Sequence, residues 1–184
     1  QGINDYGIDV LNIGLVTVDM IYFASGSMHL PAAMVTASHN PKEYNGFKLM
    51  KNDVEFIGSG SGLEEIKKII IEGSAPPHSE TKRGKVIEQS IFNAYLHHVL
   101  SFIDIDSLKP MRVAIDTGSG AVGPVIKKVL EKIPINYTPL YFAPDGDFPY
   151  REPNPSLKNN LDGLIEEVKT HHYHFGCAFD GDGD

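Results

Sequence analysis

The stretch MRVAIDTGSGAVGPVIKKVL, residues 111–130, contains two different hydrophobic periods separated by a glycine-rich turn. MRVAID is a short apolar run of the kind that forms a buried strand. After the turn, apolar side chains recur at helical spacing and form a broad stripe: Val122, Val125, Ile126, Val129, Leu130 and Ile133. A strand that leads through a tight turn into an amphipathic helix is typical of proteins in which strands and helices alternate.

The same alternation extends over the rest of the chain. We expect further strands at residues 8–14, 32–38, 47–51, 136–142 and 175–180, and further helices at 20–28, 62–73, 92–103 and 161–168. The polar stretch at 73–84, rich in proline and glycine, predicts a connector. We therefore predict an α/β protein of two α/β units, with mixed, mainly parallel sheets flanked by helices: residues 1–74, a connector at 75–89, and residues 90–184.

Two local features of the first unit lead to more detailed expectations. Asn45-Gly46 precedes the third expected strand and predicts a hairpin whose tight return uses positive φ. In the second expected helix, Leu63, Ile66 and Ile70 share one face, opposite charged residues. We expect this helix to be amphipathic and packed on the surface of the unit.

The composition indicates an ordinary globular protein and excludes several classes of partner. With 24 acidic and 16 basic residues the formal net charge is −8, and the basic residues are scattered. We therefore expect neither nucleic acid nor an anionic membrane surface as the main partner. The single cysteine, Cys177, lies in an apolar run, which predicts a buried free thiol and no internal disulfide. No run approaches the roughly 20 apolar residues of a membrane span, and no signal-peptide pattern is visible, so we expect a cytoplasmic protein.

The acidic loop DGDGD, residues 180–184, places aspartates at alternate positions. Gly181 and Gly183 have no Cβ barrier to positive φ, so the loop can curl until Asp180, Asp182 and Asp184 converge. Two carboxylates about 4 Å apart then repel by on the order of 4 kcal/mol at an effective dielectric of about 20, which a bound cation offsets. Oxygen ligands select a hard ion such as Mg²⁺ or Ca²⁺. A solvated loop without an ion is the alternative, whereas a helix-loop-helix calcium site would need a helix where a strand is expected.

The serine loop VTASHNPKEYNG, residues 35–46, is a second polar stretch that follows an expected strand. Ser38 lacks the G-x-S-x-G surroundings of a hydrolase nucleophile, and the histidines at 171–174 are expected at the surface. The loop is either an ordinary hairpin connection or the site of a serine that carries a phosphoryl group, with Lys48 nearby to supply positive charge. Because the serine loop and the acidic loop both follow strands, we expect them to face one cleft.

The turn GSGAVG, residues 118–123, matches the G-x-G-x-x-G pattern of dinucleotide-binding proteins and lies between an expected strand and an expected helix. Asp145 could then contact the ribose. Asp116 would bring negative charge near the pyrophosphate, and Pro124 removes a donor at the helix start, which weakens this interpretation. The alternative is a turn that lets the helix and the strand pack closely.

Several of these stretches resemble those of a known family. VTASHNPKEYNGFK is similar to the active-site serine loop of the α-D-phosphohexomutases, and AFDGDGD is similar to their metal loop. AIDTGSGAVGP and PDGDFPYREPNP resemble the second domain of the same family. Tyr44 favours the phosphomannomutase/phosphoglucomutase branch, because an aspartate is usual there in the phosphoglucosamine branch.

The resemblance implies an enzyme that interconverts hexose 1-phosphate and hexose 6-phosphate through a phosphoserine and a bisphosphorylated sugar. It implies that Ser38 is the phosphoserine. It also implies that Mg²⁺ is held by Ser38, Asp180, Asp182 and Asp184. The turn at 118–123 would then be structural, because the family uses no dinucleotide.

The resemblance also places three further residues at the site of phosphoryl transfer. Lys48 or His39 would assist the movement of a proton, and Asn40 would contact the hexose phosphate. Family members contain a strand-helix segment before, and two further domains after, the part that this sequence resembles. We therefore expect a piece that lacks the start of domain I and domains III and IV and that does not turn over alone. A dinucleotide-binding oxidoreductase domain and a non-catalytic binding domain of the same fold are the alternatives.

Overall fold

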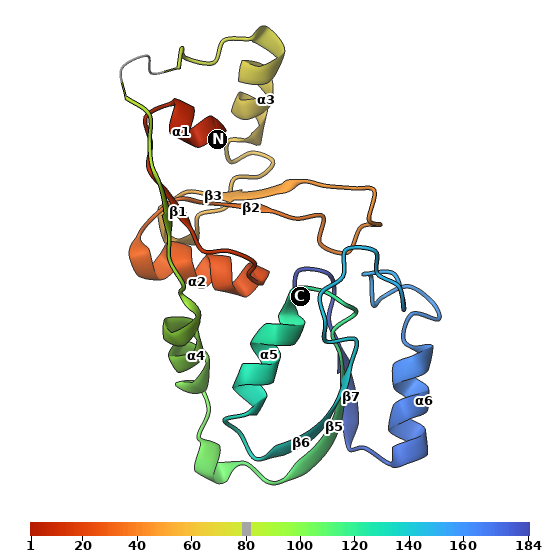
Figure 1. Cartoon of the computed structure of the whole chain (residues 1–184). Coiled ribbons are helices and arrows are strands. Elements are labelled where there is room, and N and C mark those ends of the chain that lie inside the picture. The colour runs from red at the N-terminus through yellow and green to blue at the C-terminus, as the bar shows by residue number, and fades with distance from the viewer. Residues whose placement is uncertain (79–81) are drawn as a thin grey trace.

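Strands and helices alternate along the chain in the computed structural model, which describes residues 1–78 and 82–184 (Figure 1). The helices are α1 (Gly2–Asp5), α2 (Val18–Met28), α3 (Leu63–Glu72), α4 (Phe92–Leu100), α5 (Val122–Leu130) and α6 (Asp162–His171), with 3₁₀ turns η1 (Asn52–Val54) and η2 (Ile105–Ser107). The strands are β1 (Val10–Asn12), β2 (Ala32–Val35), β3 (Phe47–Met50), β4 (Val86–Glu88), β5 (Met111–Asp116), β6 (Ile135–Leu140) and β7 (Phe175–Ala178).

The strands form three small sheets within the described ranges. β1 and β4 pair in parallel, β2 and β3 form an antiparallel hairpin, and a parallel sheet has the order β6-β5-β7. The predicted α/β class, with mixed and mainly parallel sheets flanked by helices, is confirmed. None of the helices in these ranges has the length and hydrophobicity of a membrane span.

Helices cover both faces of the three-stranded sheet. Val113 and Ile115 of the central strand pack with Leu130 of α5. On the opposite face, a Cβ added to Gly176 of β7 would touch Leu164 of α6. Figure 1 shows α5 and α6 on the two sides of this sheet. The arrangement follows from strand geometry, because successive side chains of a strand point to opposite faces.

The histidines near the start of β7 lie at the surface as predicted, whereas Cys177 is only partly buried and not fully buried as expected. The thiol of Cys177 is free and packs against the cluster beneath α5. Burial, followed by the charge of Asp116, raises the pKa of this thiol. His171, His172 and His174 are exposed.

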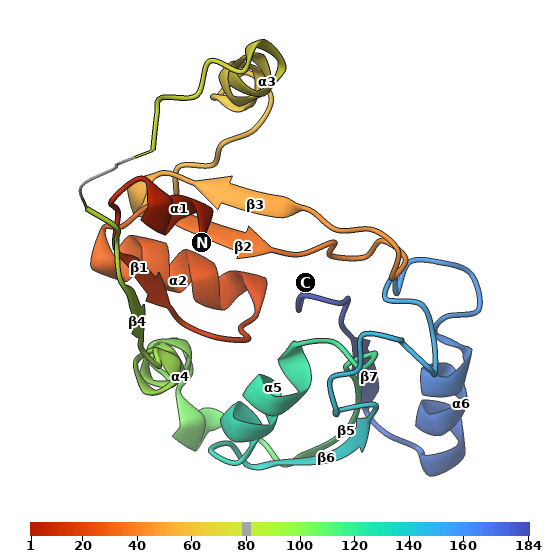
Figure 2. The same ribbon diagram turned by 45° about the horizontal axis from the view of Figure 1, so that its top comes forward.

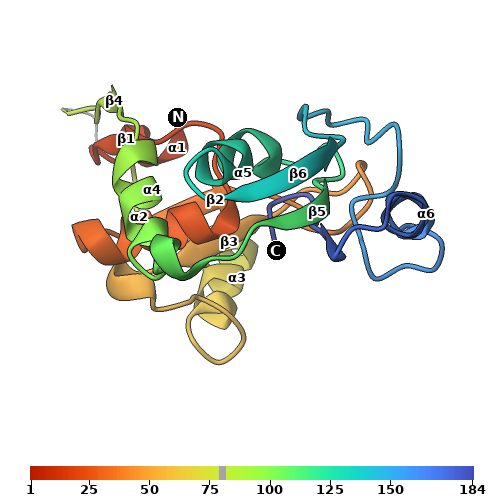
Figure 3. The same cartoon turned by 90° about the horizontal axis from the view of Figure 1, so that it is seen from below.

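Helix α2 is buried because both halves of the chain pack on it. One side contacts the hairpin through a cluster whose buried members are Val18, Ile21 and Met50. The other side contacts α4 and α5 through a second cluster: Val16, Met20, Ala24, Ile91, Tyr95 and Val125. Figure 3 shows α4 beside α2. A helix with apolar residues on more than one side is typical of such a buried position.

The predicted hairpin is present, but its return differs from the expected tight turn. Val35 lies opposite Phe47, and the amide of Thr36 donates to the carbonyl oxygen of Gly46 at 3.0 Å. Positive φ at Asn45-Gly46 was expected, and this expectation is wrong. The left-handed residue of the serine loop is Ser38, with φ of 52°. A wide loop closes the hairpin, so the geometry of a two-residue turn is not required.

Helix α3 forms where predicted, but the expected packing of its apolar face is wrong. Ile70 is 73% exposed, and Leu63 is also exposed. None of the hydrophobic clusters identified among residues 1–78 and 82–184 contains a residue of α3. Figure 2 shows why: the segment after β3 carries this helix away from α2 and the hairpin.

The predicted connector contains a strand. β4 pairs with β1, and a Cβ added to Gly84 would overlap the carbonyl oxygen of Ile8, so the two segments run in close contact. Residues 79–81 of the predicted connector lie outside the described residues. The division into units at 1–74 and 90–184 stays a prediction.

The glycine-rich turn at 118–123 is packed against two other segments. A Cβ added to Gly123 would overlap the carbonyl oxygen of Phe142. A Cβ added to Gly120 would lie 2.8 Å from the carbonyl oxygens of Asp180 and Gly181. Close packing of backbones therefore accounts for these two glycines without a bound dinucleotide.

We predict that Gly123→Ala lowers the free energy of unfolding by about 1–3 kcal/mol or more, because the added methyl group forces the α5 backbone away from Phe142. The matched control is Gly163→Ala in α6, where the nearest atom to the added Cβ, the hydroxyl oxygen of Tyr141, lies at an ordinary 3.6 Å. The control should change the stability by less than about 1 kcal/mol, with the sign set by helix propensity. Urea unfolding of both variants measures the difference, and equal losses would contradict the packing of the turn.

Candidate active site

The serine loop and the acidic loop are in direct contact. The Ser38 hydroxyl donates to Asp180 Oδ2 at 2.8 Å, across 142 residues of sequence. β7 leads into the acidic loop at its carboxyl end, and β2 leads into the serine loop at its own. In Figure 2 the C-terminal residues lie between the β2–β3 hairpin and α5. The two polar motifs therefore form one site, as expected from their positions after strands.

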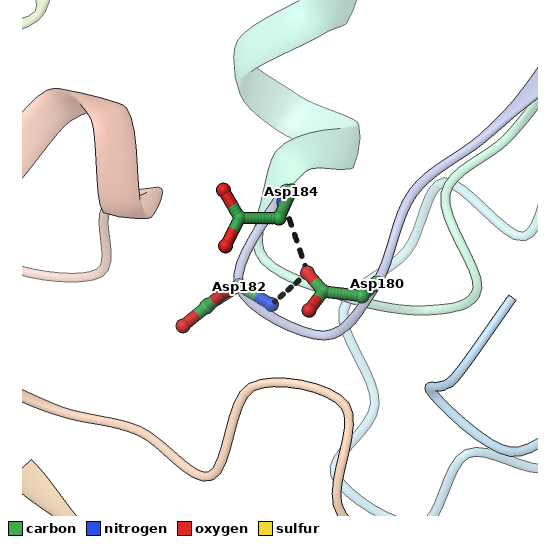
Figure 4. A group of neighbouring side chains, drawn as sticks. All are labelled: Asp180, Asp182 and Asp184. Carbon is green, nitrogen blue, oxygen red and sulfur yellow. Dashed lines mark hydrogen bonds between the residues drawn. The ribbon is translucent and has the colours of Figure 1, made fainter. Parts of the chain in front are cut away.

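The acidic loop is curled around the carboxylate of its first residue (Figure 4). Asp180 Oδ1 accepts the amides of Asp182 at 3.2 Å, Gly183 at 2.9 Å and Asp184 at 2.9 Å. Positive φ was expected to be available at both glycines, but among them Gly183 alone adopts it, with φ of 101°. Gly181 instead allows the acidic loop to approach the backbone of the serine loop, because a Cβ there would lie 2.6 Å from the carbonyl oxygen of Ser38.

The three aspartates converge as predicted, and one of their oxygens is left without a donor. Each of Asp180, Asp182 and Asp184 offers an oxygen, and these atoms lie within 4.8 Å of one another. The carboxylate of Asp182 is 3% exposed. Its Oδ2 accepts the hydroxyl of Thr36 at 2.8 Å, while its buried Oδ1 has no hydrogen-bond partner among the described residues. A buried carboxylate oxygen without a partner is costly, and a cation would satisfy it. The all-oxygen donor set fits Mg²⁺.

Lys48 supplies positive charge to the acidic loop. Its ammonium group lies 2.9 Å from Asp182 Oδ2 and 3.4 Å from Asp184 Oδ2. Burial by itself lowers the pKa of Lys48, but the hydrogen bond to Asp182 and the charges of both aspartates outweigh this, so the pKa is raised above its usual value. Lys48 is therefore held as a cation at neutral pH.

His39 and Asn40 lie in the turn that carries Ser38. His39 Nδ1 is 3.5 Å from the Ser38 hydroxyl oxygen, the outer limit of a hydrogen bond. The side-chain amide of Asn40 donates to the carbonyl oxygen of Ala37 at 2.9 Å, and the backbone amide of Asn40 donates to the same oxygen at 3.0 Å. Asn40 thus closes the turn with its nitrogen.

The starts of two helices hold the backbone of the acidic loop. The amide of Val18, in the first turn of α2, donates to the carbonyl oxygen of Asp182 at 2.9 Å. The amide of Ala121, immediately before α5, donates to the carbonyl oxygen of Gly181 at 3.0 Å. A helix start presents unpaired amides and a partial positive charge, so the starts of α2 and α5 both stabilise the acidic loop in this position.

Sequence reasoning missed a buried ion pair next to the acidic loop. Arg151 Nε lies 2.9 Å from Asp116 Oδ2, and both side chains are almost fully buried. Arg151 Nη2 also donates to the carbonyl oxygen of Phe179 at 2.6 Å. Phe179 is the residue immediately before the acidic loop. A charged residue at the end of an apolar strand was the available signal, because Asp116 in a buried position requires a partner.

We predict that Arg151→Met lowers the free energy of unfolding by about 3–5 kcal/mol, because it leaves Asp116 buried without a counter-charge. The control is Lys128→Met, which removes an exposed pair with Glu131 and should cost less than about 1 kcal/mol. Thermal and urea unfolding measure both. A small loss in Arg151→Met would show that Asp116 is solvated or paired elsewhere.

We also predict that Asp182→Asn weakens Mg²⁺ binding by about tenfold or more, because it removes charge from the central carboxylate of the cluster. Asp147→Asn is the matched control: Asp147 is exposed and pairs with Lys42 at 3.0 Å, away from the three aspartates. Calorimetric titration with Mg²⁺ compares the two variants. Equal losses would place the ion elsewhere.

Both halves of the chain match models of one protein family. Residues 1–76 match phosphoglucomutase/phosphomannomutase, alpha/beta/alpha domain I. Residues 93–184 match alpha/beta/alpha domain II of the same family. These matches include the serine loop and the acidic loop, respectively.

Curated relatives with this similarity are mutases. The chain is 36% identical over its whole length to a phosphomannomutase of Salmonella typhimurium and covers 42% of that protein. It is 36% identical to a phosphoglucomutase of Neisseria gonorrhoeae, of which it covers 39%. The chain thus spans about two fifths of the length of these relatives. The oxidoreductase alternative finds no support among them.

Solved structures agree with this assignment. A phosphoglucomutase/phosphomannomutase family protein from Burkholderia thailandensis matches 99% of this chain and 40% of its own, with a TM-score of 0.83 and 28% identity. A structure from Thermus thermophilus, 24% identical, has the same fold with a TM-score of 0.78. With both halves matched in order, the chain belongs to the phosphoglucomutase/phosphomannomutase family.

Proposed function

We propose that this chain forms the phosphoryl-transfer centre of a phosphohexomutase that interconverts hexose 1-phosphate and hexose 6-phosphate. The contact that carries the proposal is the 2.8 Å hydrogen bond between the Ser38 hydroxyl and Asp180. It places a nucleophilic oxygen directly against the carboxylate cluster that fits Mg²⁺. The phosphomannomutase/phosphoglucomutase branch is favoured by Tyr44 and by the names of the relatives.

Ser38 is the proposed carrier of the phosphoryl group. A sugar hydroxyl attacks the phosphorus of phosphorylated Ser38, so that an oxygen–phosphorus bond to the sugar forms as the bond to Ser38 Oγ breaks. The product is a bisphosphorylated hexose, and its other phosphoryl group returns to Ser38 after the sugar has turned. The first transfer therefore leaves a free Ser38 hydroxyl, and the second transfer converts it back to phosphoserine.

Charge neutralisation and alignment are the main requirements of this chemistry. Ser38, Asp180, Asp182 and Asp184 would hold Mg²⁺, which supplies positive charge next to the phosphoryl oxygens when it is bound. Lys48 contributes a second positive charge, since its raised pKa keeps it protonated.

His39 and Asn40 complete the proposed site. The attacking hydroxyl must lose a proton, and His39, with Nδ1 3.5 Å from the Ser38 oxygen, is the proposed acceptor. Lys48, held protonated, fits the opposite role of proton donor. Asn40 uses one of its two amide hydrogens for Ala37, so its second amide hydrogen and its side-chain oxygen are the atoms that would contact the hexose phosphate, the hydrogen as a donor and the oxygen as an acceptor from a sugar hydroxyl.

We predict that the natural full-length protein carries phosphate on Ser38 and that Ser38→Ala lowers mutase turnover by on the order of 10⁴-fold or more, because the group that accepts the phosphoryl is removed. Peptide mass spectrometry locates the phosphate, and a coupled assay with glucose 1-phosphate and mannose 1-phosphate measures turnover. Ser59→Ala, in an exposed loop where the hydroxyl bonds Glu64, is the control and should keep full activity. An active Ser38→Ala enzyme would refute the assignment of the nucleophile.

A further inference from the structure

We propose that Thr36 is the positioning residue of this site: its single hydroxyl sets both the backbone of Ser38 and the orientation of the Asp182 carboxylate. The inference rests on the proposed function, since it concerns the residues assigned there to phosphoryl transfer and to Mg²⁺. Three observations carry it: a hydrogen bond to Ser38, a hydrogen bond to Asp182, and the unpartnered oxygen that results.

The first observation is the conformation of Ser38. With φ of 52°, Ser38 occupies the left-handed region, which residues other than glycine rarely adopt. The amide of Ser38 donates to Thr36 Oγ1 at 2.8 Å. A hydroxyl that accepts an amide two residues further on stabilises a local turn. The amide of Thr36 donates to the carbonyl oxygen of Gly46 at 3.0 Å, which fixes the backbone from which the hydroxyl projects.

The second observation is that the same hydroxyl reaches the other half of the site. Thr36 Oγ1 lies 2.8 Å from Asp182 Oδ2, across 146 residues of sequence. A hydroxyl has one proton, and a backbone amide can only donate. Because Thr36 accepts from Ser38, its own proton is directed to Asp182.

The third observation concerns which oxygen of Asp182 remains free. Oδ2 receives two donors, the hydroxyl of Thr36 and the ammonium of Lys48 at 2.9 Å. Oδ1 is buried and has no hydrogen-bond partner in the described part of the chain. Two donors on one oxygen fix the rotation of the carboxylate, so that Oδ1 is the atom left to bind an ion. Replacing a group that orients a metal ligand in this way commonly weakens metal binding, although the group does not touch the metal.

The test compares Thr36→Val with Thr36→Ser in the full-length protein. Valine keeps the branched shape but neither donates nor accepts a hydrogen bond, whereas serine restores the hydroxyl. One readout is hydrogen exchange of the Ser38 amide in protein without Mg²⁺, followed by NMR. The other is the dissociation constant for Mg²⁺, measured by calorimetry. Thr138→Val in β6, where the hydroxyl bonds Tyr173, is the matched control and should leave both readouts unchanged.

We expect Thr36→Val to speed exchange of the Ser38 amide by about fivefold, the effect of one lost hydrogen bond. We expect it to weaken Mg²⁺ binding by about tenfold or more. Thr36→Ser should return both values to within about threefold of the parent, within the scatter of such single contacts. Parent-like exchange and affinity in Thr36→Val would overturn the inference. Losses that serine does not restore would overturn it as well, because they would assign the effect to the methyl group.

Both readouts are taken without a sugar phosphate, so they are independent of the proposed activity. If Ser38 carries no phosphate and turnover does not depend on it, the proposed function fails while the amide exchange still decides the role of Thr36. If Asp182→Asn binds Mg²⁺ as tightly as the parent, the ion lies elsewhere, and the part of the inference that concerns the metal is refuted.

Discussion

The concentration of negative charge in the acidic loop is the constraint on which the rest of the structure depends. Its three aspartates place oxygens within 4.8 Å of one another, where like charges repel strongly. The carboxylates accept hydrogen bonds from the backbone of the loop itself, from the hydroxyls of Thr36 and Ser38, and from the ammonium of Lys48. The oxygen that these donors leave free, Oδ1 of Asp182, is the atom for which a cation is the natural partner.

Because these donors come from both halves of the chain, the site depends on how the halves pack. The start of α2 binds one carbonyl oxygen of the acidic loop, and the residue before α5 binds another. The same two helices share a hydrophobic cluster that includes Met20 and Val125. The core and the site are therefore coupled, since a shift of α2 against α5 would move the two helix starts that hold the loop.

Close approach of backbones and one buried ion pair complete the arrangement. Gly120 and Gly181 lie where any side chain would collide with a neighbouring carbonyl group, so the glycine turn, the acidic loop and the serine loop come into direct contact. Arg151 neutralises Asp116 and also binds the carbonyl oxygen of Phe179, which fixes the residue from which the acidic loop departs. Ser38 holds a left-handed conformation within this tightly packed region, which fits a residue with a functional role.

The sequence by itself determined the strand at 111–116, the helix that follows it, and the convergence of the acidic loop, because hydrophobic period and the backbone freedom of glycine are local properties. It also pointed to Ser38 and Lys48 as residues of one site through their motifs. Only the tertiary structure decided that Thr36 joins Ser38 to Asp182, that Arg151 neutralises Asp116, and that the apolar face of α3 stays exposed. These features are contacts, or missing contacts, between segments far apart in the chain, and they depend on how helices and sheets pack rather than on any local pattern.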